Sequence, residues 1–244
     1  MSTTPKGSET RIDEIADGIY RISTPTDVVP GGFTFNQFLI LDEDPLLFHT
    51  GLRGTFAPVK EAIGRVMPVE KLRYVSFSHV EADECGALNH FLAVAPRAVP
   101  VCSRTAAMVS VNDLADRAPR ALADGETLRL GRHSVQWHDT PHLPHSWESG
   151  LMTETTTSTL LCGDLFTHPG ADLPPVTESD ILGPSEQMRA AMNYYSQARE
   201  ASQMLRGLAA SKPRTLALMH GSSWKGDGGK LLTALADLLA AGSK

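Results

Sequence analysis

The spacing of apolar and polar residues changes several times along the chain, and each change predicts a strand or a helix. Residues 12–23 alternate like two strands and are interrupted by Asp17-Gly18, a dipeptide favoured in hairpin turns. Helical spacing is found at residues 56–66, and again at the apolar positions 88, 91, 92 and 95 of a helix that opens at Asp83 or Glu84. Further strands are expected at residues 33–41, 46–49, 72–77, 98–102, 127–130, 134–139, 151–155, 159–162 and 215–219, and further helices at 104–114, 185–208 and 230–240.

These elements fall into two halves, the second of which begins near Gly125. Each half is a cluster of strands with helices between them, which indicates an α/β protein with two β-rich halves and helices outside. Residues 167–183 are rich in proline and are expected to form a long surface loop. We assign residues 11–244 to a single domain and the polar residues 1–10 to a disordered N-terminal tail.

Composition and charge argue against several classes of protein. The chain has 244 residues, 41% of them hydrophobic, which is enough for one sizeable core. Its net charge of −6 and the lack of a Lys/Arg block disfavour a nucleic-acid or membrane partner, and its apolar runs are too short to span a bilayer. The N-terminus lacks the apolar segment of a signal peptide, and Cys85, Cys102 and Cys162 form no Cys-x-x-Cys pair, which fits a reduced cytoplasmic compartment.

Five segments place a metal-ligating type of residue at the end of an expected strand, where α/β proteins commonly carry their chemistry. They contain His49; His79, Glu81 and Asp83; His142 and His145; Asp164; and His220. Alternate positions of an extended segment point the same way, so the side chains at 79, 81 and 83 are expected to share one side. A set rich in carboxylates suits hard metal ions better than soft ones.

Each segment by itself also has a simpler interpretation. The stretch from His79 to Asp83 could be a solvated turn that caps a helix, and Gly163-Asp164 could be a plain turn. A single histidine at a strand end, such as His220, is more often a hydrogen-bonded structural residue. The order of all five segments together is what favours a metal site.

That order, His-x-Glu-x-Asp followed by His, Asp and His-Gly, resembles the metallo-β-lactamase superfamily. Glu81 stands where hydrolases of that superfamily have a second His. With a Glu at this position, the chain resembles the flavodiiron and oxygen-binding diiron proteins. The stretches from His145 to Ser149 and from His220 to Trp224 resemble two further motifs of this group. The resemblance implies a metallo-β-lactamase-like four-layer αββα sandwich.

The resemblance also implies a pair of metal positions. Position one would be formed by His79, Glu81 and His145, and position two by Asp83 and His220. Asp164 would bridge them. The expected metals are two iron ions, with manganese or zinc as the other options.

Two departures from the family pattern concern residues near these positions. Glu84 stands where relatives have a His, and is expected to face the metal pocket as an extra ligand or as a hydrogen-bond partner of a bound water. His49 stands where the superfamily has an Asp, and is expected to hydrogen-bond to a ligand. His142 is expected to form a wall of the pocket, so that Glu84 and His142 are the candidate catalytic residues.

The expected function is that of a non-haem diiron protein that binds or reduces dioxygen, as a sensor or as a stand-alone oxidoreductase domain. The sequence contains no flavodoxin-like unit, so no FMN is expected in this chain, and a separate electron donor or signalling partner is expected instead. The sequence leaves open whether the protein forms a homodimer. The alternative is a metal-dependent hydrolase of a thioester, lactone or phosphodiester, and a metal-free scaffold is least favoured because every ligand position is filled.

Overall fold

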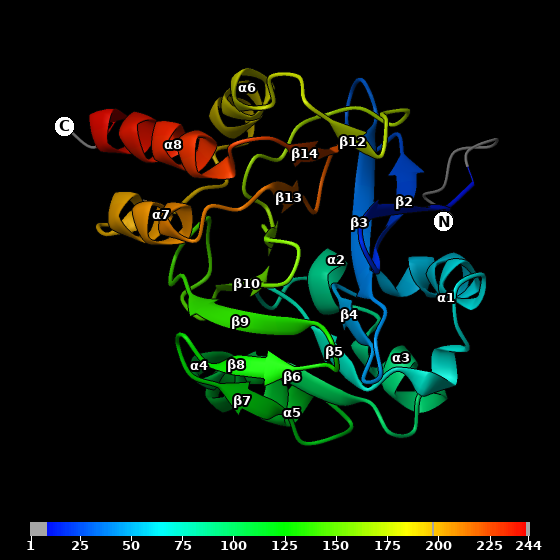
Figure 1. The fold of residues 1–244 in the computed structure, drawn as a ribbon. Coiled ribbons are helices and arrows are strands. Elements are labelled where there is room, and N and C mark those ends of the chain that lie inside the picture. The colour runs from blue at the N-terminus through cyan, green and yellow to red at the C-terminus, as the bar shows by residue number, and fades with distance from the viewer. Residues whose placement is uncertain (1–8, 197, 243–244) are drawn as a thin grey trace.

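The computed structural model describes residues 9–242 except residue 197, and shows two seven-stranded sheets packed face to face with helices outside (Figure 1). In the first sheet the strands follow chain order: β1 (Arg11–Ala16), β2 (Ile19–Thr26), β3 (Phe33–Ile40), β4 (Leu46–Phe48), β5 (Tyr74–Ser76), β6 (Val99–Ser103) and β7 (Arg120–Leu122). In the second sheet the order is β12 (Val176–Thr177), β14 (Ser223–Lys225), β13 (Thr215–Ala217), β11 (Thr159–Leu161), β10 (Gly150–Glu154), β9 (Ser134–Asp139) and β8 (Thr127–Arg129).

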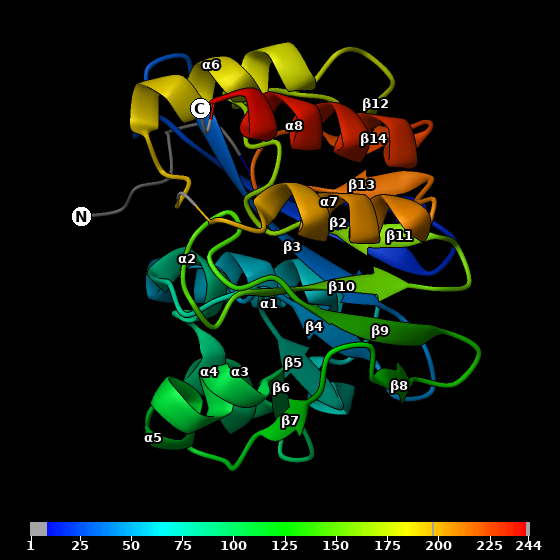
Figure 2. The same cartoon turned by 90° about the vertical axis from the view of Figure 1, so that its left-hand side faces the viewer.

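The helices form the two outer layers, as two views at right angles show (Figures 1 and 2). They are α1 (Phe56–Gly64), α2 (Ala82–Cys85), α3 (Leu88–Val94), α4 (Arg104–Ala106), α5 (Asn112–Leu114), α6 (Leu182–Met192), α7 (Ala201–Ala210) and α8 (Gly228–Gly242). The short helices Arg53–Thr55 and Val69–Lys71 have 3₁₀ geometry, and Ala107–Val111 is π-helical and joins α4 to α5. The expected four-layer αββα fold is therefore confirmed.

Three hydrophobic clusters hold the four layers together. The alternation of side chains along β3 places Leu39 with the cluster under α1 and α3, whereas Phe38 packs between the two sheets. Trp137 of β9, fully buried, belongs to the same middle cluster. The third cluster joins the outer face of the second sheet to α7 and α8 through residues such as Leu205 and Leu232. Each face of each sheet is thus covered by apolar side chains.

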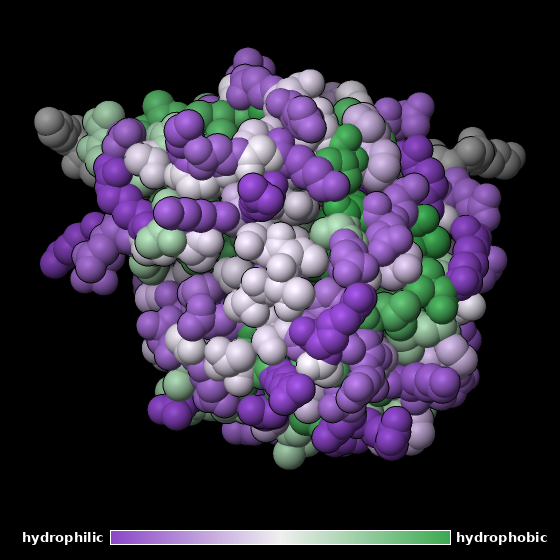
Figure 3. All heavy atoms as spheres, in the orientation of Figure 1, coloured by the Kyte–Doolittle hydropathy of each residue, from purple (hydrophilic) through white to green (hydrophobic). Residues whose placement is uncertain are grey.

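The surface of the face seen in Figure 1 is largely polar, and apolar residues show on it only in small patches (Figure 3). Isolated apolar residues on a surface are normal and do not by themselves mark an interface. Within the described residues, none of the helices is long and apolar enough to cross a membrane.

Most of the expected strands are present, but the long helix expected at residues 185–208 is wrong. The chain leaves α6 at Asn193, which has a left-handed φ of 50°, and the next helix begins only at Ala201. Asparagine tolerates this conformation better than most residues and often ends a helix. The short strands β7, β12 and β14 were not expected, because strands of two or three residues give almost no periodic signal. The tail expected at residues 1–10 lies outside the described residues as far as residue 8, and Thr10 is buried.

One close contact ties the second sheet to the loop after β5. The backbone N–H of Gly150 donates to the carbonyl of Ser78, and a Cβ atom at Gly150 would lie 2.1 Å from the ring of Trp137. Gly150→Ala should therefore lower the free energy of unfolding by about 1–3 kcal/mol through overpacking. The control is Gly64→Ala in α1, where an added methyl meets open space and should stabilise the helix by about 0.5–1 kcal/mol. Urea unfolding of both variants is the measurement, and equal effects would contradict the packing argument.

Candidate metal centre

The candidate ligands lie in four loops at one edge of the sandwich. His79 follows β5, Glu81 precedes α2, and Asp83 lies in the first turn of α2. The other three come from the second sheet: His145 lies between β9 and β10, Asp164 follows β11, and His220 follows β13. The register of β10 against β11 brings the start of one strand beside the end of the other, so the loops of His145 and Asp164 meet.

Four of these side chains converge on one small space. The Nε2 atoms of His79 and His145 each lie 2.9 Å from the same oxygen, Oε2 of Glu81. The Oδ2 atom of Asp164 lies 3.7 Å from His79 Nε2 and 3.6 Å from His145 Nε2. One ligand atom from each of the four residues falls within 4.8 Å of the others, so this group could hold a metal ion.

A second group adjoins the first through the other oxygen of Asp164. His220 Nε2 lies 3.2 Å from Asp164 Oδ1 and 3.4 Å from Asp83 Oδ2. Asp164 Oδ1 is buried, and within the described part of the chain it makes no well-directed hydrogen bond besides its ion pair with His220. A buried carboxylate oxygen with so few hydrogen bonds fits a position beside a cation.

The charges of the group explain its shifted acidities. Burial alone would lower the pKa of His79, but the carboxylates of Glu84 and Glu81 raise it to about 10. For His220 burial likewise lowers the pKa, and Asp164 and Asp83 raise it to about 10. Hydrogen bonds from His145 and His79 lower the pKa of Glu81 well below its usual range. The carboxylates therefore favour positive charge at the site, which protonated imidazoles or a metal cation can supply.

Hydrogen bonds behind two of the imidazoles set which nitrogen faces the site. The Nδ1 atom of His79 lies 2.8 Å from Ser78 Oγ, and the Ser78 hydroxyl in turn donates to Glu84 Oε2 at 2.8 Å. The Nδ1 of His220 lies 2.8 Å from the carbonyl oxygen of Thr34, to which it donates. In both residues a proton on Nδ1 leaves the lone pair of Nε2 directed toward the carboxylates.

The expectation that Glu84 faces the metal pocket is wrong. Glu84 is fully buried behind His79, where its Oε2 also accepts from the backbone N–H of Ser78 at 3.0 Å and lies 2.7 Å from His49 Nε2. Successive residues of a helix point about 100° apart, so Asp83 and Glu84 in α2 cannot share one direction. The two residues that depart from the family pattern, His49 and Glu84, thus contact each other.

The expected role of His142 as a wall of the pocket is also not found. Its side chain is exposed, it has a left-handed φ of 63°, and its backbone N–H donates to Ser146 O at 2.7 Å. His142 is not among the residues that line the cavity beside the candidate ligands. Of the two histidines, His145 is the one whose Nε2 lies near Glu81, 2.9 Å from its Oε2, and its role as a metal ligand stays a prediction.

A cavity of about 160 Å³ lies against the two groups. Besides five of the candidate ligands it is lined by Phe33, Thr167, Met188, Met192 and Tyr194. The phenol of Tyr194 donates to the backbone carbonyl of Asp164 at 3.2 Å, and the ring of Phe33 stacks on His220. Tyr194 was not predicted as part of the site, because it lies in the break between α6 and α7, where a continuous helix was expected.

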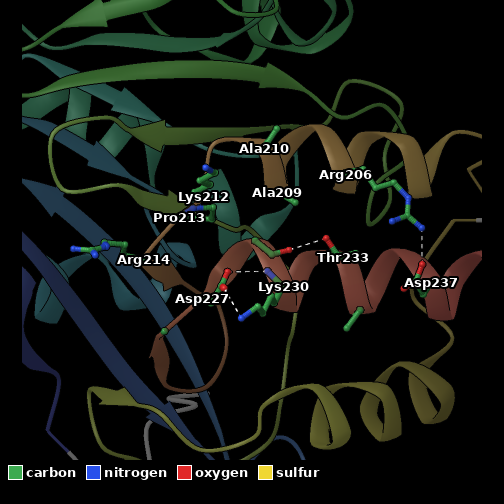
Figure 4. Close-up of a pocket in the computed structure, with 13 residues that line it drawn as sticks. Arg206, Ala209, Ala210, Lys212, Pro213, Arg214, Asp227, Lys230, Thr233 and Asp237 are labelled. Atoms are coloured by element: carbon green, nitrogen blue, oxygen red, sulfur yellow. Dashed lines mark hydrogen bonds and ion pairs between the residues drawn. The ribbon is translucent and has the colours of Figure 1, made fainter.

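A much larger groove, of about 1090 Å³, lies between α7 and α8, away from the candidate ligands (Figure 4). It is lined by charged side chains that include the ion pairs Arg206–Asp237 and Lys230–Asp227. None of the candidate ligands lines this groove.

The fold defines a metallo-β-lactamase-like protein, and its converging imidazole and carboxylate groups form a cluster that could bind a metal ion. The family described as "ODP family beta lactamase" matches residues 33–221, and the chain belongs to that family. The resemblance expected from the motifs is thereby confirmed.

Known relatives extend the comparison. A nitric oxide reductase from Moorella thermoacetica is 25% identical over 248 aligned residues, which cover 91% of this chain and 60% of the relative. A rubredoxin-oxygen oxidoreductase from Megalodesulfovibrio gigas is 30% identical over 141 residues, or 56% of this chain and 34% of the relative. The crystal structure of the flavodiiron protein from Giardia intestinalis shares the fold, with a TM-score of 0.77 and 21% identity over 96% of this chain and 60% of that one. The chain thus spans about a third to three fifths of the length of these relatives.

The burial of Glu84 predicts the effect of removing its charge. Glu84→Gln replaces an acceptor of two hydrogen bonds from Ser78 and should lower the free energy of unfolding by about 1–3 kcal/mol. The control is Glu70→Gln at an exposed position, which should change stability by at most about 0.5 kcal/mol. Because Glu84 faces away from the cavity, Glu84→Gln should also leave the number of metal ions bound at saturation unchanged. Loss of one metal per chain at full stability would restore the ligand interpretation.

Proposed function

We propose that this protein is a non-haem diiron protein that reacts with dioxygen. The observation that carries the proposal is the Asp164 carboxylate, which has one oxygen beside His79 and His145 and the other beside His220. Two-metal sites hold their ions about 3.5–4 Å apart, a span that one carboxylate can bridge. The names of the two sequence relatives, an oxygen oxidoreductase and a nitric oxide reductase, support the same class of chemistry.

The ligand assignment follows the two groups of side chains. His79, Glu81 and His145 would hold the metal at position one, and Asp83 and His220 would hold the metal at position two. Asp164 would serve both. With Glu84 turned away, position two has one fewer protein ligand than position one, which leaves room there for a small molecule.

The balance of carboxylates and imidazoles favours iron over zinc. Three carboxylates and three imidazoles make up the two groups, and Glu81 supplies an anionic oxygen to both imidazoles of position one. Hard oxygen ligands suit iron and manganese better than they suit soft metals. Anionic ligands also stabilise the ferric state relative to the ferrous state, whereas zinc has no redox chemistry to be tuned.

When bound, a pair of ferrous ions supplies two electrons, whereas reduction of dioxygen to two water molecules takes four electrons and four protons. The remaining electrons would come from a separate electron donor. The side chain of Glu81 is 51% exposed, so a donor can approach within contact of a proposed ligand. A small, largely apolar cavity also adjoins the candidate ligands. Its walls, among them Phe33, Met188 and Tyr194, limit access to small molecules.

The choice of His145 as ligand gives the first test of this proposal. His145→Ala should bind about one metal ion fewer per chain at saturating iron, because it removes a ligand atom from position one. The matched control is His142→Ala, three residues away and exposed, which should keep both metals. The measurement is iron bound per chain after anaerobic loading and removal of free metal. Two metals retained in His145→Ala would refute the assignment.

The redox chemistry is tested directly by admitting dioxygen to the protein loaded with ferrous iron. A new visible absorption band should form within seconds in a stopped-flow spectrometer, with dioxygen consumed in proportion to the iron pairs, because ferrous iron is oxidised. The control is the same protein loaded with zinc, which should show no band. An unchanged spectrum and no dioxygen uptake with iron, together with zinc-dependent cleavage of thioesters or lactones, would support a hydrolase instead.

A further inference from the structure

A fully buried arginine lies between the two sheets behind His220. Arg21 of β2 is 0% exposed, and its Nη2 donates to the carbonyl oxygen of Gly221 at 2.8 Å. Its Nε and Nη1 make no hydrogen bond, and no carboxylate forms an ion pair with it, among the residues that the structure describes. Burial is the main cause that lowers the pKa of Arg21, to about 10, so the side chain is still charged at neutral pH. A buried charge is costly, and within the described residues the Gly221 carbonyl is the one hydrogen-bond partner of this guanidinium.

The turn at His220 and Gly221 is held by residues of the first sheet. The Gly221 carbonyl accepts a second hydrogen bond, from Asn36 Nδ2 at 2.8 Å, and the Gly221 N–H donates to Thr34 Oγ1 at 2.9 Å. Thr34 and Asn36 are two positions apart on β3 and therefore point to the same side of the sheet. The backbone of the turn is also packed closely against its surroundings. Gly221 has a φ of +94°, and a Cβ there would lie 2.4 Å from the ring of His168, so only glycine fits at this position.

We propose that Arg21, together with Thr34 and Asn36, is a positioning residue for His220. The Thr34 hydroxyl binds the N–H of the peptide that joins His220 to Gly221, and Arg21 and Asn36 bind the carbonyl of the next peptide. The Thr34 carbonyl accepts from Nδ1 of the same imidazole. The His220 Nε2 is thereby directed at Asp164 and Asp83. This inference rests on the two metal positions of the proposed function, and it assigns to β2 and β3 the control of position two alone.

The two metal positions are supported from different parts of the molecule. The hydrogen bonds behind His79 run through Ser78 and Glu84 within the loop after β5 and α2. Those behind His220 cross from the first sheet to the second. A change at Arg21 should therefore weaken metal binding at one position and spare the other, which a general loss of stability would not do.

The test is anaerobic titration with ferrous iron, in competition with a chromophoric chelator, on the full chain. Arg21→Met keeps the bulk of the side chain but removes the donor, and should weaken one of the two binding steps by about 10–100-fold while the other is unchanged. Arg21→Lys, which keeps the charge and one donor group, should restore part of the affinity. The control is Arg65→Met, which removes an exposed arginine and should bind iron like the unaltered protein.

A second variant keeps the inference testable if Arg21→Met does not fold. Thr34→Val is nearly isosteric and removes only the acceptor of the Gly221 N–H, so it should weaken the same binding step. Two unchanged binding steps in both variants, or equal weakening of both steps, would overturn the role given to Arg21. That result would leave the diiron proposal intact, whereas a single binding step in the unaltered protein would contradict both.

Discussion

The carboxylate of Asp164 is the point on which the arrangement of the site depends, because its two oxygens face different groups of side chains. One oxygen lies near His79 and His145, and the other near His220. Asp164 and His220 belong to the second sheet, whereas His79, Glu81 and Asp83 follow a strand of the first. The site therefore exists only when the two sheets are packed in one relative position, and the middle apolar cluster with Trp137 fixes that position.

Burial of polar groups around the ligands is the cost of this arrangement. His49, Glu84 and Arg21 are all fully buried, and each is directed at the backbone or side chain next to a candidate ligand. A buried polar group is destabilising unless it is paired. The hydrogen-bonded arrangement of such residues is therefore strongly favoured over any arrangement that leaves them unpaired. This is the physical reason why imidazoles at the edge of two sheets can present Nε2 in a fixed direction.

The sequence was most informative where its signal was local. Alternation predicted β3 correctly, and the spacing to Asp164 pointed to His145, the Nε2 of which lies 3.6 Å from Asp164 Oδ2. It failed at the helix expected for residues 185–208, because the left-handed turn at Asn193 is compatible with but not demanded by the residues around it. It also failed at Glu84, whose direction depends on where α2 begins, and a shift of one residue turns a side chain by about 100°.

The residue types alone determined the kind of chemistry available to this protein. Imidazoles and carboxylates in the order of a known family predicted the fold and the candidate ligands, and led us to expect a hard metal, because these expectations depend on which residue types are present. Only the tertiary structure decided which atoms meet. It paired His49 with Glu84, placed Tyr194 at the cavity and set Arg21 behind His220, across 200 positions of sequence. Such contacts join segments whose local patterns carry no information about each other, so they arise only when the sheets pack.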